Sequence, residues 1–406
     1  MYSFWEVLKI SAYAAISAWS VQSRAGSLLK RWQPVKGVIR AASSTKPVRK
    51  IICRRIELAL FTSKQYGFLR LLVNAAVLPV IFRGIAERPG AGYPFFVSIL
   101  PYRSYSAYLK ERYGVPAYRV AVDAGFSCPN RAGGRSREGC SYCEISGARA
   151  VYLDRTGPEN LRMQVARGVE FLSKRYGARV LLLYFQAYTN TLGSVGELRR
   201  LYDDCLEMAP FRELIVSTRP DEIDGPRADL LASYRGEDFD VWVELGLQSV
   251  HDATLKRINR GHDSAAFFRA YDMLKERGIK TAVHLIFGLP GEGRREIMES
   301  VRRVAALRPE GIKLHNLHIP VSSPLYREYL KGTLTVPSPA RHAEYVAEAL
   351  ALLPPETLIM RMTCDTPSAR RGAPLWVPGK SAFSNEVVRL MGIKKERQGD
   401  RFPAAG

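Results

Sequence analysis

Three cysteines in one short stretch have the spacing of a metal centre. Cys128, Cys140 and Cys143 stand as C-x11-C-x2-C, and a glycine-rich loop connects the first two. Two cysteines separated by two residues place their thiolates on one tight turn, and the loop brings the third thiolate to the same place. Such a face of three sulfurs suits a metal centre that keeps one coordination position open.

Two kinds of metal centre compete for this face. A structural zinc ion takes four protein ligands, and no fourth cysteine or histidine lies within a few residues of Cys143. A 4Fe-4S cluster held by three cysteines instead leaves one iron free to bind a substrate or a cofactor. The residues alone favour the cluster, with zinc and unremarkable thiols as the alternatives.

The remaining cysteines show no comparable pattern. Cys53, Cys205 and Cys364 stand singly, and we interpret them as small buried hydrophobic residues or incidental thiols. Six cysteines in 406 residues, three of them clustered, do not resemble a disulfide framework. We therefore expect a reducing compartment and a cytoplasmic protein.

Alternating strands and helices must position the three thiols. Apolar and β-branched runs predict six strands, and amphipathic runs predict the helices between them. The strands are expected at residues 118–124, 178–186, 213–217, 240–248, 281–288 and 311–317. The helices are expected at residues 158–175, 195–208, 227–234, 264–277 and 294–307. This order gives parallel βαβ units with right-handed crossovers, and it predicts an α/β fold with a partial (βα)6 barrel.

Polar residues gather where the predicted strands end. They are found at residues 186–191, at residues 217–221, at Gln248 with Ser249, and at His284. In parallel sheets of this kind, ligands bind at the carboxyl ends of the strands. We therefore expect a cofactor or substrate site at this edge of the barrel.

The distribution of charge and the pattern of apolar residues divide the chain into three parts. Residues 1–100 hold 15 Lys and Arg against 3 Asp and Glu, which is more than half of the net charge of +21. We interpret them as a poorly ordered basic N-terminal extension outside the core. Three interpretations remain open for this extension. It is a membrane-surface or targeting segment, a basic RNA-binding appendage, or upstream sequence that was included because the translation start was wrongly chosen. Its apolar run at residues 67–82 is too short and too interrupted for stable membrane insertion.

The other two parts are the barrel and a C-terminal extension. The barrel is expected over residues 101–320, and an α+β extension over residues 321–406. The extension has predicted helices at residues 341–353 and 381–397, and a strand at residues 357–363. The large positive surplus of the whole chain favours a polyanionic partner, either nucleic acid or an anionic membrane surface.

Six motifs in one order resemble a known family. They are Ala124-Gly-Phe-Ser-Cys-Pro-Asn-Arg131, Tyr184-Phe-Gln-Ala-Tyr-Thr-Asn-Thr191, Ser217-Thr-Arg-Pro-Asp221, Glu244-Leu-Gly-Leu-Gln-Ser249, Ile258-Asn-Arg-Gly-His-Asp263 and His284-Leu-Ile-Phe-Gly-Leu-Pro-Gly-Glu292. Together they resemble the YhcC-like radical S-adenosylmethionine (SAM) proteins, relatives of the elongator catalytic subunit. The resemblance covers about residues 102–395 and includes the long gap between the first two cysteines, which is typical of YhcC-like proteins.

The resemblance implies a cofactor pair and its chemistry. A 4Fe-4S cluster on the three cysteines would bind SAM at its open iron through the SAM amino and carboxylate groups. An electron from the reduced cluster would cleave SAM to methionine and a 5'-deoxyadenosyl radical, which abstracts a hydrogen atom from the substrate. The protein would supply orientation and a dry barrel interior.

The resemblance also implies SAM contacts, but it assigns no catalytic residue. The matching positions are Gln186, Ala187, Tyr188 and Asn190 after the second strand, Ser217 where the elongator relatives have Glu, Gln248 as a ribose or carboxylate contact, Arg260 as a carboxylate partner, and His284 where some relatives have an acidic ribose ligand. Simpler structural roles remain open as well. They are helix capping for Gln248 and Ser249, a surface charge for Arg260, core packing for His284 and Tyr188, and a turn for Arg219 and for residues 288–291.

These expectations lead to a radical SAM enzyme that acts on tRNA, as a transferase or lyase on a modified wobble uridine. The elongator catalytic subunit modifies that base, and some YhcC-like members are inferred to remodel its carboxymethylaminomethyl group. The expected partners are tRNA and a one-electron donor such as flavodoxin or ferredoxin. Basic residues that could meet phosphates are Arg361, Arg370, Arg371, Lys380, Lys394 and Lys395. The alternatives are a radical SAM enzyme acting on a small metabolite or protein side chain, and a non-catalytic, zinc-stabilised RNA-binding protein.

Overall fold

The computed structural model describes residues 100–131, 139–144, 152–153, 160–364, 370–375 and 378–403. The chain divides into two units, Met1–Phe95 and Phe96–Gly406, and every described residue belongs to the second unit. The expectation of a poorly ordered N-terminal extension therefore lies outside the described residues. None of the described helices is long and apolar enough to cross a membrane.

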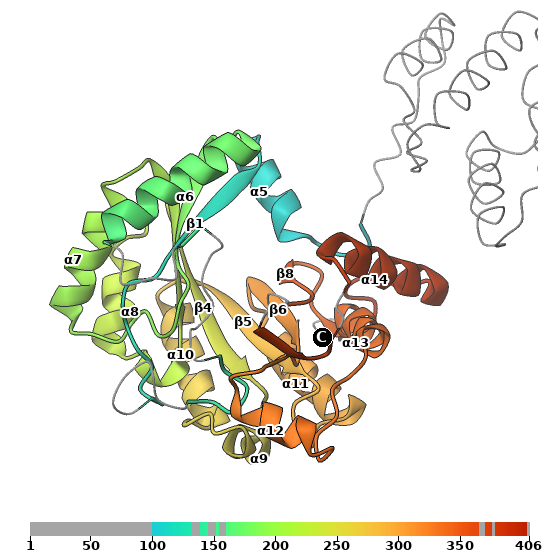
Figure 1. Ribbon diagram of the computed structural model, residues 1–406. Helices are drawn as coiled ribbons and strands as arrows, with labels where there is room; N and C mark the ends of the chain where they lie inside the picture. The colour runs from blue at the N-terminus through green and yellow to red at the C-terminus, as the bar shows by residue number, and fades with distance from the viewer. Residues whose placement is uncertain are drawn as a thin grey trace, which may run out of the picture. The chain divides into compact units, whose positions relative to one another are not determined.

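A curved parallel sheet forms the centre of the second unit (Figure 1). Its strand order is β1-β2-β3-β4-β5-β6-β8, and all neighbours are parallel. The strands are β1 (Ala117–Val122), β2 (Val180–Phe185), β3 (Phe211–Thr218), β4 (Asp240–Gln248), β5 (Lys280–Phe287), β6 (Gly311–Asn316) and β8 (Leu358–Arg361). The six predicted barrel strands are all present, which confirms the partial barrel. The C-terminal part adds a seventh strand to the same sheet, because β8 pairs with β6.

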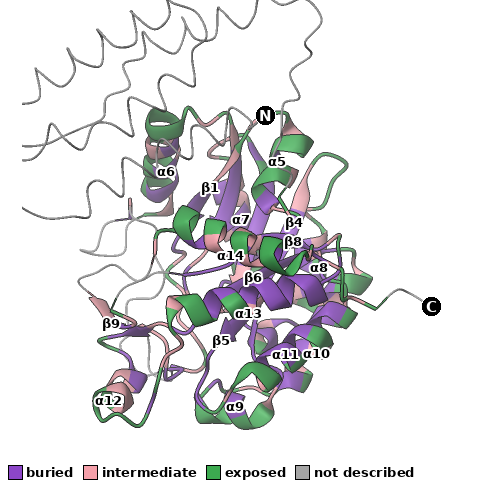
Figure 2. Cartoon of the chain, turned by 90° about the vertical axis from the view of Figure 1, so that its right-hand side faces the viewer, coloured by how far each residue is buried: buried purple, intermediate pink, exposed green. Residues whose placement is uncertain are grey.

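Helices cover the outer face of the sheet (Figure 1). They are α6 (Leu161–Tyr176), α7 (Val195–Leu206), α8 (Gly225–Ala232), α10 (Ser264–Glu276), α11 (Arg294–Ala306), α13 (Pro339–Leu352) and α14 (Lys380–Lys394). Their apolar faces share one core with the outward-facing strand residues, such as Leu181 and Leu183 of β2 and Leu198 of α7. Figure 2 shows the strands buried and the outer faces of α6 and α14 exposed, which explains the amphipathic pattern of the helices.

The inner face of the sheet carries an apolar cluster near the amino-terminal ends of the strands. Tyr105 and Leu109 of α5 (Tyr105–Tyr113) belong to a second cluster with Leu182, Ile215 and Trp242. Leu182 alternates with the outward-facing residues of β2, as the two-residue period of a strand requires. The α5 side chains therefore fill this end of the barrel, and the cysteine loop follows β1 at the opposite, carboxyl end.

Several short elements were not predicted from the sequence. They are α5, the 3-10 helix η3 (Pro220–Glu222), α9 (Asp252–Arg257), α12 (Pro324–Leu330), and the strands β7 (Ile319–Pro320) and β9 (Arg371–Ala373), which pair antiparallel. These elements are too short to show a clear hydrophobic period, because a period needs a longer window to be recognised. The two short helices α9 and α12 lie next to the cysteine site.

Candidate metal centre

The three cysteines lie at the carboxyl end of the sheet, on the loop after β1. Gly125 turns the chain with a φ of +83° just before Cys128, a conformation that favours glycine. The Arg131 amide then donates to the Cys128 carbonyl oxygen at 2.8 Å. In a second turn the Cys143 amide donates to the Cys140 carbonyl oxygen at 2.9 Å. Both halves of the motif therefore form tight turns, and residues 132–138 between them lie outside the described part.

Backbone hydrogen bonds attach this loop to other strand ends. The Ser141 amide donates to the Ile258 carbonyl oxygen at 2.9 Å, directly after α9. The Leu325 amide in α12 donates to the Ser141 carbonyl oxygen at 3.0 Å. The Thr189 amide, after β2, donates to the Ser127 carbonyl oxygen at 3.3 Å. Segments that follow β1, β2, β4 and β6 are therefore brought together around the thiols.

Each thiol sulfur accepts a hydrogen bond from a different arginine. The donor–sulfur distances are 3.3 Å from Arg131 Nη2 to Cys143, 3.8 Å from Arg219 Nη1 to Cys128, and 3.6 Å from Arg260 Nη1 to Cys140. All three arginines are buried, with exposed fractions of 3%, 3% and 5% in the same order. Buried guanidinium groups require anionic or strongly accepting partners, and the three sulfurs are such acceptors here.

Electrostatics act differently on the two thiols of the CxxC turn. Burial disfavours the thiolate of Cys140, but Arg260, Arg219 and Asn130 together hold the pKa of this thiol below its usual value. Burial and the nearby Cys140 thiol raise the pKa of Cys143, although Arg131 opposes them. Two buried thiolates repel one another, and a positively charged metal centre between them would relieve this repulsion.

A single metal ion needs several donor side chains around one point. Among the described residues, no group of three histidine, cysteine, aspartate or glutamate side chains could hold one metal ion. A zinc site places all its donors around one centre, whereas an iron–sulfur cluster distributes its cysteine ligands over separate iron atoms. The described part therefore offers no closed site of the kind that the zinc-stabilised alternative requires.

The predicted SAM segment after β2 lies beside the cysteine loop. The Gln186 amide donates to the carbonyl oxygen of Val122, the last residue of β1, at 3.2 Å. Ala187 is buried, and Tyr188 has a left-handed backbone with a φ of +63°. The Arg131 guanidinium lies 5.7 Å from the centre of the Tyr188 ring. A strained non-glycine backbone next to a cofactor loop is typical of a functional segment.

Asn190 and Ser217 come together at the ends of β2 and β3. The Asn190 side-chain amide donates to the carbonyl oxygens of Phe185 at 3.1 Å and Ser217 at 2.9 Å. The Asn190 backbone amide also donates to the Ser217 carbonyl oxygen, at 3.2 Å. The amide nitrogens of Asn190 therefore tie two strand ends together, and they support the site by holding its framework.

Gln248, Gly246 and Arg260 form the part of the site contributed by β4 and the segment after α9. Arg260 Nη2 donates to the Gly246 carbonyl oxygen at 2.7 Å, while Nη1 contacts the Cys140 sulfur. Arg260 therefore connects β4 to the cysteine loop, and it is buried and not a surface charge. A Cβ atom on Gly246 would lie 2.7 Å from Gln248 Nε2 and 2.9 Å from Arg260 Nη2. Gly246 therefore leaves room for two polar side chains. Ser249, by contrast, donates to the Glu292 carboxylate and has a structural role.

His284 belongs to a buried charge network inside the barrel, which the sequence analysis did not identify. The Glu244 carboxylate accepts hydrogen bonds from Arg119 Nη1 at 2.6 Å, from the Tyr184 hydroxyl at 2.6 Å, and from Lys313 Nζ. His284 Nε2 lies 3.3 Å from the same carboxylate. Glu244 precedes Gly246 by two residues on one strand, so both face the barrel interior. The network therefore lies directly beneath the contact of Arg260 with Gly246.

The network has unusual proton affinities. Burial favours the protonated form of Glu244, but Lys313 and Arg119 hold the pKa of this carboxylate well below its usual value. Burial lowers the pKa of Lys313 to about 7, although Glu244 opposes the shift. Burial and Lys313 lower the pKa of His284 to about 4. Single charged residues within apolar strands were the sequence signal that could have revealed this network.

A second close pair was also missed. The Cys364 sulfur lies 2.9 Å from His318 Nδ1 and donates to the Asn316 carbonyl oxygen at 3.4 Å. Burial opposes protonation of His318, but the Cys364 thiol raises the pKa of the imidazole. Cys364 and His318 come from segments that are far apart in the sequence, so neither residue type alone indicated the pair.

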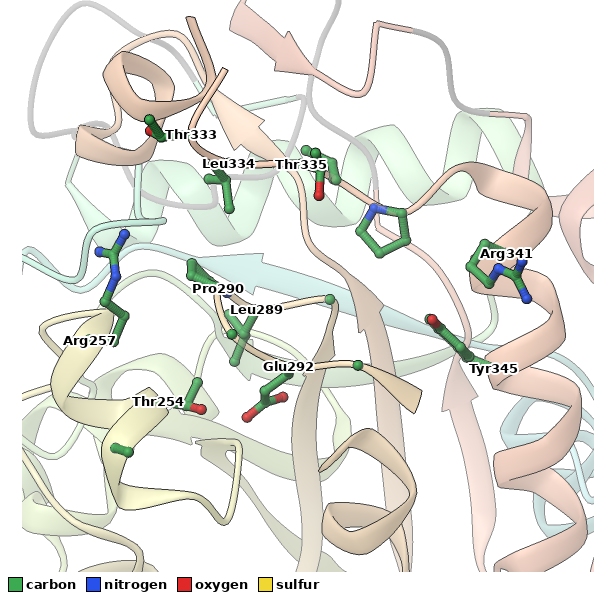
Figure 3. Close-up of a pocket in the computed structure, with 16 residues that line it drawn as sticks. Thr254, Arg257, Leu289, Pro290, Glu292, Thr333, Leu334, Thr335, Arg341 and Tyr345 are labelled. Carbon is green, nitrogen blue, oxygen red and sulfur yellow. The ribbon is translucent and has the colours of Figure 1, made fainter. Parts of the chain in front are cut away.

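A cavity of about 860 Å³ lies beside the site (Figure 3). It is lined by α9, by the loop of residues 288–293 after β5, and by residues 333–337 with the start of α13. Thr254, Glu292 and Tyr345 approach it from three different elements in Figure 3. None of the three clustered cysteines lines this cavity, so it is distinct from the cysteine site.

Comparisons with known proteins agree with this geometry. A sequence model of the radical SAM superfamily matches residues 131–304, and a model of the radical SAM C-terminal domain matches residues 309–392. The chain is 38% identical to protein YhcC of Escherichia coli (strain K12) over 284 residues, which are 70% of this chain and 90% of YhcC. The chain belongs to the radical SAM superfamily. It is also 33% identical to YtqA of Bacillus subtilis (strain 168) over 310 residues, 76% of this chain and 95% of YtqA.

The radical SAM relatives include elongator proteins. Elongator complex protein 3 of Homo sapiens is 32% identical over 128 residues, which are 31% of this chain and 23% of that protein. The solved structure of the Methanocaldococcus infernus Elp3 with an N-terminal deletion has a TM-score of 0.53 at 20% identity, and the match covers 59% of this chain and 60% of that one. The likeness to the solved structure shows a shared fold. Together the comparisons confirm the predicted resemblance to YhcC-like radical SAM proteins and elongator relatives.

The cysteine site fits the 4Fe-4S cluster and SAM, the cofactors of the radical SAM superfamily. Each of its three thiols has a guanidinium partner. Buried polar atoms near the thiols also have no hydrogen-bond partner within the described part of the chain; they are Ser127 Oγ, Ser141 Oγ, Thr189 Oγ1 and Arg260 Nε. Such buried atoms are rare in folded proteins unless a further molecule satisfies them.

Proposed function

We propose that this radical SAM enzyme acts on tRNA, at the carboxymethylaminomethyl side chain of a wobble uridine. The kinship with YhcC-like and elongator proteins supports the choice of substrate class. The net charge of +21 supports a polyanionic partner. A one-electron donor of the flavodoxin or ferredoxin class would reduce the cluster.

The observation that carries this proposal is the charge inside the barrel. Arg119 and Lys313 both contact the single carboxylate of Glu244, so the network has an excess of positive charge when both bases are protonated. Lys313 and Glu244 are almost fully buried, with exposed side-chain fractions of 3% and 0%. A buried positive excess favours an anionic group on the substrate. A substrate carboxylate provides such a group.

Each part of the site has a proposed role. Cys128, Cys140 and Cys143 would hold the cluster, which with bound SAM would supply radical chemistry for hydrogen abstraction from the substrate. We assign SAM orientation to the segment after β2, to Gln248 and to Arg260, whose Nε donor is buried without a partner among the described residues.

The remaining polar groups support this arrangement. Asn190 and Ser217 hold the strand ends in place. His284 lies beside the Glu244 carboxylate, with its Nε2 atom 3.3 Å from a carboxylate oxygen. The apolar cluster around Trp242 and α5 excludes water from the amino-terminal end of the barrel.

Nucleoside mass spectrometry tests the proposed substrate. A strain that lacks the gene should show an altered wobble-uridine side chain in its tRNA. Wild-type protein should restore the modification, whereas Cys143→Ala should not, because the cluster then loses one ligand. Cys205→Ala is the matched control, since Cys205 is buried in the outer core away from the cysteine loop. An unchanged nucleoside profile in the deletion strain would reject tRNA as the substrate and leave a metabolite or a protein side chain.

A further inference from the structure

We propose that Arg131, Arg219 and Arg260 form an arginine collar that raises the reduction potential of the cluster held by Cys128, Cys140 and Cys143. The proposal rests on the cluster as cofactor and not on tRNA as substrate. Its subject is the ease with which an electron enters the cluster, a step that precedes any contact with the substrate.

The geometry of the collar is one guanidinium to one sulfur. Its members come from separate segments: Arg131 follows the first cysteine, Arg219 follows β3, and Arg260 follows α9. The donor–sulfur distances range from 3.3 to 3.8 Å. Three independent segments therefore deliver one donor each, so the contacts are not a by-product of a single loop.

Hydrogen bonds to backbone carbonyl oxygens hold the arginines of the collar in place. Arg131 Nη2 also donates to the Glu144 carbonyl oxygen at 2.8 Å, next to the CxxC turn. Arg219 Nη1 donates to the Arg260 carbonyl oxygen at 2.8 Å. Two members of the collar are thus joined directly, and each guanidinium forms a second hydrogen bond, which for Arg260 runs from Nη2 to the Gly246 carbonyl oxygen.

Fixed positive charge changes the reduction equilibrium in a known direction. Reduction adds one electron from an external donor to a cluster whose cysteine ligands are already anionic. Hydrogen bonds to the sulfurs and nearby cations stabilise the extra negative charge, so they favour the reduced state. Because the guanidinium groups are buried, solvent screens this interaction only weakly.

The Asp221 carboxylate acts against the collar, so its replacement tests the direction of the predicted shift in reduction potential. Asp221 accepts hydrogen bonds from Arg219 Nε at 2.9 Å and from Arg219 Nη2 at 2.7 Å. It therefore orients Arg219 and also offsets part of its charge. Replacing Asp221 by Asn removes the negative charge and keeps an oxygen acceptor for the guanidinium. This change should make the cluster easier to reduce, whereas loss of Arg219 should make it harder.

The test is a redox titration of the full-length protein, reconstituted with iron and sulfide without oxygen and measured without SAM. The variants are Arg131→Gln, Arg219→Gln and Asp221→Asn, and iron and sulfide contents are determined for each. Electron paramagnetic resonance measures the ratio of reduced to oxidised cluster at each applied potential. Arg227→Gln is the matched control, because the described contacts of Arg227 are with Asp224 and backbone oxygens and not with sulfur.

We expect about a tenfold fall in this ratio for each of the Arg131 and Arg219 variants, which equals a shift of about 59 mV for one electron. The ratio should rise for Asp221→Asn and stay at the wild-type value for the control. Fully loaded variants that titrate like wild type would overturn the proposal. If a glutamine variant binds iron poorly, Asp221→Asn decides the outcome, and an unshifted potential in that variant would also overturn the proposal.

Discussion

Lys313 should make the stability of this protein depend on pH in a way that one substitution removes. Its pKa falls from 10.5 to about 7 in the folded state, because burial disfavours the ammonium group. The unfolded chain therefore binds more protons than the folded chain between these two values. By linkage, the contribution of Lys313 to the free energy of unfolding rises with pH in this window.

The size of the effect follows from the two pKa values. One pKa unit corresponds to about 1.4 kcal/mol, so the contribution of Lys313 should become more favourable by about 2 kcal/mol between pH 7 and pH 9. Glu244 adds no slope in this range, because its pKa lies well below 4.5 in the folded state. The raised pKa of Tyr184 matters only near or above pH 10, where the unfolded tyrosine begins to ionise.

The assay compares wild type with Lys313→Met. Anaerobic urea unfolding of the reconstituted full-length proteins at pH 7, 8 and 9 gives the difference in the free energy of unfolding at each pH. Between pH 7 and pH 9, the free energy of unfolding of wild type should rise by about 2 kcal/mol relative to that of the variant. Leu314→Met, on the same strand but facing the outer core, changes no titratable group and should show a constant difference. A constant difference for Lys313→Met would show that our account of the buried lysine is wrong.

Two further pairs of substitutions test the fold and the metal centre. Gly288→Ala should destabilise the protein by more than Gly291→Ala in chemical denaturation. Both glycines have a φ of +87°, but only at position 288 would the new Cβ collide with Pro337, at 2.3 Å. The strain at position 291 alone should cost about 1–2 kcal/mol, and equal costs would contradict the predicted collision. Cys140→Ala should lose most of its iron on anaerobic reconstitution, whereas Cys205→Ala should keep it; iron retention by Cys140→Ala would reject Cys140 as a cluster ligand.

The sequence predicted the barrel well because its strands are apolar on both faces. Runs such as residues 180–185 are buried by helices outside and by packed side chains inside, so the apolar pattern is continuous. The strand at residues 358–361 was also predicted, but its place beside β6 was not. Its partner lies more than forty residues away, and local patterns do not encode such a pairing.

The candidate site was predictable only where its reactive residues stand close together in the sequence. The spacing of Cys128, Cys140 and Cys143 predicted a metal centre, and the structure places both halves of the motif in tight turns after β1. In the sequence, a turn was one open interpretation of Arg219, and Glu244 had no assigned role although it is a charged residue within a buried strand. Their roles depend on side chains from distant segments meeting in space, which no local pattern reports.

Residues near the two ends of the described part are joined by hydrogen bonds. The Gln398 amide donates to the Pro101 carbonyl oxygen at 2.8 Å, and the Arg103 amide donates to the Gln398 side-chain oxygen at 2.8 Å. Ser104 also forms an isolated parallel bridge with Ile359. During synthesis these contacts can therefore form only after Gln398 has left the ribosome. The same proximity makes a circular permutant feasible, in which a short linker connects these stretches and new termini open at the exposed loop near Gly332.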